Sequence, residues 1–200
     1  MVKKVLTDVY DYWFGTLAGP DDYPKEKAEL WFSAKPEFDE EIRQTFGKYL
    51  PAARDTEWDV ANLSRMEQVG LVVLLDQFPR NIHRTGGDAF AYDTKALAVA
   101  RQLLASGGGN FYRAERQFVS LPFMHSENLA DQDFCVWFAA SEMMAARSPE
   151  ALEMWRRFFD FAAKHWAIIR KFGRFPHRNV ALGRESTAEE VEFLKAGRGF

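Results

Sequence analysis

The sequence has very little cysteine, since Cys135 is the single one in 200 residues. One thiol excludes a disulfide within the chain, and so low a content is typical of proteins from a reducing compartment. Cys135 lies in the apolar stretch Phe134–Phe138, without an evident cationic neighbour. We therefore expect a small buried hydrophobic residue there and not a catalytic thiol.

Long apolar runs are also lacking. The longest one, Val69–Leu75, is far too short to cross a bilayer. Near the N-terminus, Asp8 and Asp11 interrupt the segment in which the apolar part of a signal peptide would lie. The sequence therefore predicts a cytoplasmic protein that does not bind membranes.

Neither sign of charge dominates the chain, which has 26 basic and 29 acidic side chains and a net charge of −3. A chain with this balance and no long basic stripe is not expected to bind DNA or RNA. Glycine motifs of the P-loop or dinucleotide-binding type are absent, and we expect no cofactor. The histidine spacing fits no known ligand motif, so we expect no metal site.

Strand-like alternation is nearly absent, and almost every segment has the period of a helix. The sequence therefore predicts one all-α domain over residues 1–200, with about nine antiparallel helices. Capping boxes at Ser64–Glu67 and Ser186–Glu189 predict two helix starts. Pro51 and Pro122 are expected to end the helices that precede them.

Two segments share a Phe-Pro pair that is followed closely by Arg-Asn. The first motif is Leu71–Arg84, LVVLLDQFPRNIHR, and the second motif is Phe172–Arg184, FGRFPHRNVALGR. The helix that enters the first motif is apolar on all sides, which is typical of a central, buried helix. We interpret the two motifs as the walls of one polar site.

The two motifs hold five arginines, and Asp76 is the single acid of the first motif. A guanidinium does not lose its proton, so this local positive excess is either solvated or binds an anion. We predict a small anionic ligand, with a phosphate or carboxylate group. Its predicted binding residues are Gln77, Arg80, Asn81, Arg84, Arg174, His177, Arg178, Asn179 and Arg184.

Three residues are candidates for proton transfer: Asp76, His125 and Glu127. Burial of Asp76 would raise its pKa and suit a general base, whereas pairing with Arg174 or Arg178 would make it structural. Glu127 can orient His125 and raise the pKa of that imidazole. Whether a reaction is catalysed is left open.

Three long motifs, LLDQFPRNIHR, LPFMHSENLADQ and FGRFPHRNVALGRESTAEEVEFL, resemble the DUF924 family of uncharacterised proteins. With the early DYWFG and the pair Trp31-Phe32, the resemblance covers nearly the whole chain. It implies an all-α fold grouped with the tetratricopeptide-like superhelices, and no known activity or cofactor. It also marks Gln132 and His165 as polar motif positions. One departure is His165-Trp-Ala-Ile-Ile169, where relatives often have an acid at the third position.

The same resemblance motivates a second hypothesis, a helical module that binds a protein partner. The polar motifs would then be structural links within the fold. Independently of either hypothesis, His165 lies mid-stripe on a long helix and is expected to be a core histidine with its hydrogen bonds satisfied. The oligomeric state is left open.

Overall fold

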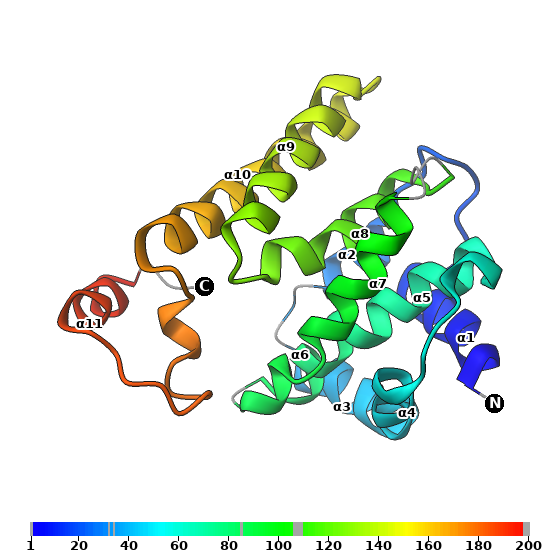
Figure 1. Ribbon diagram of the computed structural model, residues 1–200. Coiled ribbons are helices and arrows are strands. Elements are labelled where there is room, and N and C mark those ends of the chain that lie inside the picture. Colours follow the sequence, from blue (N-terminus) through cyan, green and yellow to red (C-terminus); the bar gives the residue numbers. More distant parts are fainter. Residues whose placement is uncertain (1, 32, 34, 85, 106–109, 198–200) are drawn as a thin grey trace. The chain divides into compact units, whose positions relative to one another are not determined.

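The computed structural model describes residues 2–31, 33, 35–84, 86–105 and 110–197. All structural statements below refer to these residues, which leave out Phe32. This described part is all-α, without a strand, as predicted (Figure 1). Nine of its α-helices have seven or more residues. The two shorter ones are α4, with six residues, and α6, with five.

The contacts within the chain divide it into two compact units. Unit 1 is Met1–Arg84 with Asp88–Pro122, and unit 2 is Thr85–Gly87 with Phe123–Phe200. Each unit is described by itself below. The expectation of one domain stays a prediction, as does the superhelical arrangement.

The α-helices that begin in unit 1 are α1 Val2–Phe14, α2 Lys25–Trp31, α3 Pro36–Phe46, α4 Leu50–Asp55, α5 Arg65–Asp76, α6 Phe78–Ile82, α7 Asp93–Ala105 and α8 Arg113–His125. Those that begin in unit 2 are α9 Leu129–Ala145, α10 Pro149–Phe172 and α11 Ala188–Lys195. Four 3-10 helices connect them: η1 Gly47–Tyr49, η2 Val60–Asn62, η3 Gly87–Phe90 and η4 Pro176–Arg178.

The core of unit 1 is built around α5, in which every residue from Val69 to Asp76 is buried, as its apolar sequence predicts. The helix lies directly against α1. A Cβ atom at Gly70 would come within 2.0 Å of the backbone oxygen of Leu6. Only glycine therefore permits this approach of the two helices.

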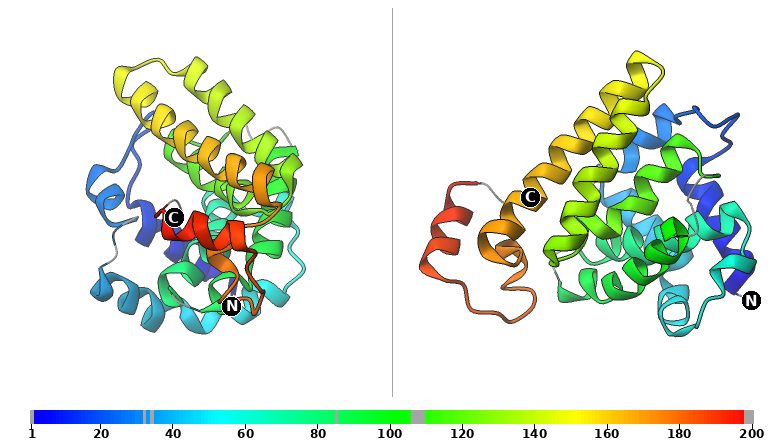
Figure 2. Two further views of the ribbon diagram at one scale, coloured as in Figure 1. Left: turned by 90° about the vertical axis from the view of Figure 1, so that its left-hand side faces the viewer. Right: turned by 45° about the horizontal axis from the view of Figure 1, so that its top comes forward.

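In unit 2, α9 and α10 run side by side as an antiparallel pair (Figures 1 and 2). The ring of Phe138 on α9 meets the edge of Trp155 on α10 with a centroid distance of 6.0 Å. Cys135 is fully buried, and this burial raises the pKa of its thiol to about 12. The prediction of a buried cysteine is confirmed.

Three local predictions are wrong in detail. Pro51 lies in the first turn of α4, where its missing N–H costs no hydrogen bond, so it helps to begin a helix. Pro122 lies inside α8, which continues to His125. The second capping box joins Thr187 and Glu190, because the Ser/Thr-x-x-Glu pattern also fits one residue further on. The first capping box, at Ser64 and Glu67, is confirmed.

No helix in the described ranges is both long enough and apolar enough to span a bilayer.

Candidate functional site

The first motif lies in unit 1, at the junction of α5 and α6. Asp76 is the last residue of α5, is fully buried and accepts a hydrogen bond from Gln77. Arg80 follows on α6, and its Nη1 lies 2.6 Å from the backbone oxygen of Asp76 and 3.5 Å from the carboxylate. The break at Pro79 therefore does not prevent the contact between residues four apart.

Acids from two other helices complete the contacts of the first motif. Arg80 Nη2 donates to Asp93 at the start of α7, at 3.0 Å. On α3, Asp39 accepts from Asn81 Nδ2 and from Arg84 Nη2, each at 2.8 Å. Both arginines of the first motif thus contact a carboxylate within unit 1.

Glu127 and Arg184 connect the second motif to the segment that follows α8. Arg184 donates two hydrogen bonds to the carboxylate of Glu127, from Nη1 at 2.7 Å and from Nη2 at 3.0 Å. The backbone N–H of Phe175 donates to the same carboxylate at 2.8 Å. Burial alone would raise the pKa of Glu127, but the bonds from Arg184 and Phe175 hold it below its ordinary value.

A second carboxylate, that of Glu190 on α11, holds the other end of this motif. Arg174 donates to it from Nε at 2.7 Å and from Nη2 at 2.8 Å, and the side chain of Glu190 is almost fully buried. Asn179 joins the two acids, because its Nδ2 donates to Glu190 at 3.3 Å and its Oδ1 accepts from Arg184 at 3.0 Å. The result is one continuous network from Glu127 to Arg174.

Sequence reasoning missed the acids that face three of the five motif arginines, Arg80, Arg84 and Arg174. Counting charges within the motifs predicted a positive excess, but Asp39, Asp93 and Glu190 lie outside both motifs. All three lie in the first turn of a helix, where the helix dipole favours an anion. That shared position is a signal that the sequence contained.

Around the ring of Phe175, the structure gathers what we call the basic cluster: His125, His165, His177 and Arg178. The ring centroid of Phe175 lies 5.5 Å from that of His165 and 5.6 Å from that of His177. Arg178 places Cζ 4.5 Å from the same centroid, and His125 lies 6.5 Å from His165. Phe175 is fully buried, whereas the three histidines are partly exposed.

His165 is the member of the basic cluster that sequence reasoning placed in the core. Its Nδ1 lies 2.8 Å from the backbone oxygen of Phe161, one turn earlier on α10. Burial lowers the pKa of His165 to about 3, and the charges of His125, Arg178 and His177 add to this effect. His165 is therefore neutral near pH 7.

Gln132, a motif position of the resemblance, holds the end of α8 from which His125 projects. Its side chain is fully buried, and Nε2 lies 2.7 Å from the backbone oxygens of Met124 and Ser126 and 3.3 Å from that of Phe123. These carbonyls lie where a helix end has no backbone partners of its own. Gln132 thus positions a member of the basic cluster without belonging to it.

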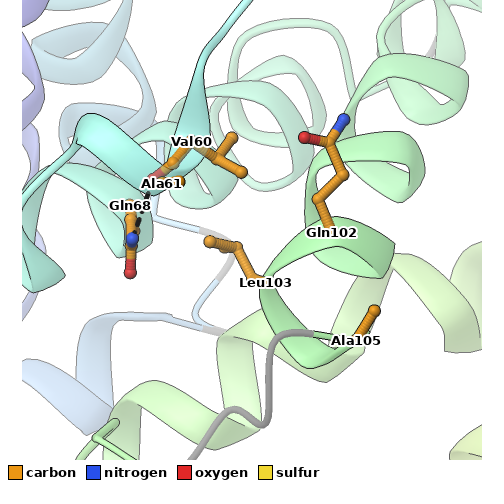
Figure 3. Close-up of a pocket in the computed structure, with 6 residues that line it drawn as sticks. All are labelled: Val60, Ala61, Gln68, Gln102, Leu103 and Ala105. Carbon is orange, nitrogen blue, oxygen red and sulfur yellow. Dashed lines mark hydrogen bonds between the residues drawn. The ribbon is translucent and has the colours of Figure 1, made fainter.

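A hollow of about 430 Å³ lies in unit 1, away from the predicted site residues (Figure 3). Its walls carry apolar groups and two amides but no charged side chain, so it does not suit the predicted anion. The lining residues are Val60, Ala61, Gln68, Gln102, Leu103 and Ala105. Within the described ranges, no group of three or more histidine, cysteine, aspartate or glutamate side chains is arranged to hold a metal ion.

The predicted site residues therefore fall into two sets. Asp76, Gln77, Arg80, Asn81 and Arg84 belong to unit 1, and all the others belong to unit 2. Within unit 2, Glu127, Arg174, Asn179 and Arg184 share one network, and His125, His177 and Arg178 share the basic cluster. That both motifs line one site stays a prediction.

Comparison with known proteins first places the chain in a class, the all-α bacterial proteins of unknown function. A solved structure of a protein of unknown function from Agrobacterium tumefaciens has a TM-score of 0.78 and 28% identity, over 98% of this chain and 100% of that chain. The family model described as "Bacterial protein of unknown function (DUF924)" matches residues 9–198. The chain belongs to the DUF924 family, as the motifs indicated. No curated protein matches it.

Proposed function

We propose that the basic cluster in unit 2 binds a small anion that carries a phosphate or carboxylate group. The observation that supports this is the composition of the cluster. It unites three of the four histidines of the chain with the buried Arg178 around one phenylalanine ring. Arg178 opposes the protonation of the imidazoles near it, and an anion among these groups would relieve that repulsion.

The surroundings suit such a ligand. Glu127 lies close enough to feel the charge of Arg178, but two donors of Arg184 already engage its carboxylate. The partly exposed His125 and His177 can be reached from solvent, and protonated imidazole N–H groups are anion donors. We assign Arg174, Asn179 and Arg184 the role of holding the loop that presents His177 and Arg178.

A histidine-resolved NMR titration tests this proposal on the intact protein. Phosphate and acetate are added separately at constant ionic strength, and the imidazole resonances are followed. We expect those of His125, His165 and His177 to shift in a saturable way. His83, the fourth histidine, lies on unit 1 outside the cluster and is the internal control.

A matched pair of variants, His177→Gln and His83→Gln, extends the test to thermal unfolding. Phosphate is expected to raise the Tm of the wild type and of His83→Gln, and to raise that of His177→Gln much less. Equal phosphate responses in all three proteins, or no response of any cluster histidine to either anion, would contradict the proposal.

A second candidate function is binding of a protein partner through α9, and a distribution of exposed side chains favours it. All eight of the large exposed hydrophobic residues belong to unit 2, and none belongs to unit 1 within the described ranges. Trp137 is 63% exposed and Met144 is 85% exposed, two turns apart on one face of α9. This spacing suits the apolar face of a helix from a partner.

Capture of partners with the wild type and with the double variant Trp137→Ser, Met144→Ser tests this second candidate. The second candidate function is supported if one protein is captured by the wild type and by His177→Gln but not by the double variant. A protein that all three capture equally does not use this face.

A further inference from the structure

We infer that the partner that fits the exposed face of α9 is a second copy of this chain, and that the two copies pair there in an antiparallel, two-fold arrangement. This rests on the second candidate function, binding of a protein partner through α9, and names the partner. The argument depends on the order of the side chains along this face.

The exposed face of α9 is a stripe of side chains at alternating spacings of four and three residues. Such spacing keeps side chains on one side of a helix. The members of the stripe are Asp133, Trp137, Ala140, Met144 and Arg147. Ala140 is half-buried and the other four are exposed, whereas the buried residues Cys135, Phe138 and Ala139 point to the other side of the helix. The stripe is therefore on the surface of α9.

The two ends of the stripe carry opposite charges. Asp133 lies one turn before Trp137, and Arg147 follows the C-cap residue Ala146, close behind Met144. The middle of the stripe is uncharged, with an indole ring, a methyl group and a flexible thioether. This order decides which pairing of two identical copies is favourable.

An antiparallel pairing brings each end of the stripe to the opposite end of the other copy. Asp133 then faces the partner's Arg147, and the two-fold symmetry makes this contact twice. Trp137 faces the partner's Met144, and contacts between a thioether and an aromatic ring are favourable. Ala140 lies near the two-fold axis, where a small side chain permits a close approach of the two helices. Every contact along the stripe is therefore complementary.

A parallel pairing of the two copies is disfavoured by the same order of side chains. It would place Asp133 against the partner's Asp133 and Arg147 against the partner's Arg147, and like charges repel. A helix of another protein fits the stripe only if it has a matching order of side chains, whereas a second copy always has it. This self-complementary order is the observation that points to a second copy.

The size of the stripe predicts a weak dimer. From Asp133 to Arg147 it is about 20 Å long, at a rise of roughly 1.5 Å per residue. A contact between two single helix faces of this length buries less than the roughly 1,600 Å² of a standard-size interface. We therefore expect a dissociation constant on the order of 10–100 µM.

Sedimentation equilibrium of the full chain between about 1 and 500 µM tests the inference, since this range spans the expected dissociation constant. The wild type is expected to pass from monomer to dimer. Met144→Glu places an unpaired charge against the partner's Trp137 and is expected to weaken the dimer at least about tenfold. Val180→Glu, at another exposed apolar side chain of unit 2, is the matched control and should dimerise like the wild type.

Two results of this experiment would overturn the inference. One is a wild type that stays monomeric over the whole concentration range. The other is a dimer that Met144→Glu and Val180→Glu affect equally, because such a dimer does not use the face of α9.

Two charge reversals test the antiparallel order. Asp133→Lys puts like charges at both ends of the pair, and so does Arg147→Glu, so each variant alone is expected to dimerise at least about threefold more weakly. A mixture of the two variants can form a heterodimer in which both end contacts join opposite charges. We expect the mixture to recover the wild-type affinity, and a mixture no tighter than the separate variants would overturn the antiparallel pairing.

Salt dependence decides if Asp133→Lys does not fold, since Asp133 also accepts a hydrogen bond from Trp166 at 2.7 Å. Added sodium chloride screens exposed charges. It is therefore expected to weaken the dimer of the wild type and to tighten that of Arg147→Glu. The same change in both proteins would overturn the inference.

These results can be told apart from those of partner capture. A monomeric wild type that captures another protein through Trp137 and Met144 would overturn the inference and leave the second candidate function standing. If neither self-association nor capture depends on these two side chains, both are wrong.

Discussion

The two Phe-Pro pairs each lie at the start of a short helix but have very different surroundings. Each proline lies in the first turn of a short helix, Pro79 in α6 and Pro176 in η4. Phe78 packs against other rings, with centroid distances of 5.7 Å to Trp13 and 5.1 Å to Phe46. Phe175 has imidazoles and a guanidinium around it instead.

The asparagines that follow the two turns show what the motifs share. Asn81 donates to Asp39 in the first turn of α3, and Asn179 donates to Glu190 in the first turn of α11. The asparagine of each Arg-Asn pair thus connects a turn to a helix start in its own unit. This shared part is structural, and the difference between the units lies in the histidines around Phe175.

The largest expected effect is on the aromatic side of this comparison. Phe78→Ala is expected to lower the free energy of unfolding by about 3–5 kcal/mol, because a fully buried ring leaves a cavity. Urea denaturation measures the change. Val180→Ala, at a side chain that is 91% exposed, is the control and is expected to change it by less than about 0.5 kcal/mol. A loss below about 1 kcal/mol for Phe78→Ala would contradict the view that Phe78, unlike Phe175, belongs to a packed aromatic core.

An intermediate effect is expected from removing one acid in each unit. Asp39→Asn and Glu127→Gln should each cost about 1–3 kcal/mol, because the arginine that faces each acid keeps its charge. Only Glu127→Gln is expected to shift the imidazole resonances of the basic cluster, since its carboxylate bonds the backbone of Phe175. Glu57→Gln, with a side chain that is 97% exposed, is the control for both. Equal histidine shifts in Asp39→Asn would break the comparison.

The smallest effect is one of pH, at Glu190. The hydrogen bonds from Arg174 lower the pKa of this carboxyl from 4.5 to about 2. A lowered folded-state pKa gives stability that is fully present above the unfolded value and is lost as pH falls toward the folded one. The difference in unfolding free energy between wild type and Glu190→Gln should therefore be constant above about pH 5 and shrink toward pH 2.

Denaturation midpoints measured from pH 2 to 7 give this difference directly. Glu192→Gln lies on the same helix beside an exposed lysine and is the matched control, for which we expect a nearly flat difference. If the Glu190→Gln difference were the same at every pH, the ion pair with Arg174 would not be the source of stability.

Most helices could be predicted from the sequence because their causes are local. The apolar period, the capping box at Ser64 and the Ser148-Pro149 start of α10 all act within one or two turns. Predictions were wrong at positions where the local sequence rules for helix ends and capping boxes permit two outcomes. Pro122 stays inside α8, and the pattern Ser/Thr-x-x-Glu occurs in two overlapping positions, of which Thr187 and Glu190 form the box.

The site was less predictable because its contacts join residues far apart in sequence. Arg84 contacts Asp39 across 45 positions of the sequence, and Arg184 contacts Glu127 across 57. Helical period does not say which helix starts lie near which loop. For the same reason the position of His165 on α10 did not indicate its neighbours in the cluster, which come from α8 and η4.

The close approach of α1 and α5 at Gly70 has a consequence for synthesis of the chain on the ribosome. The apolar face of α1, with the fully buried Leu6 and Trp13, is made first, but the glycine that receives it comes much later. At about 5–20 residues per second, translation takes several seconds to add the intervening chain. During that time the nascent α1 exposes its hydrophobic face, and this interval is when a chaperone has most to bind.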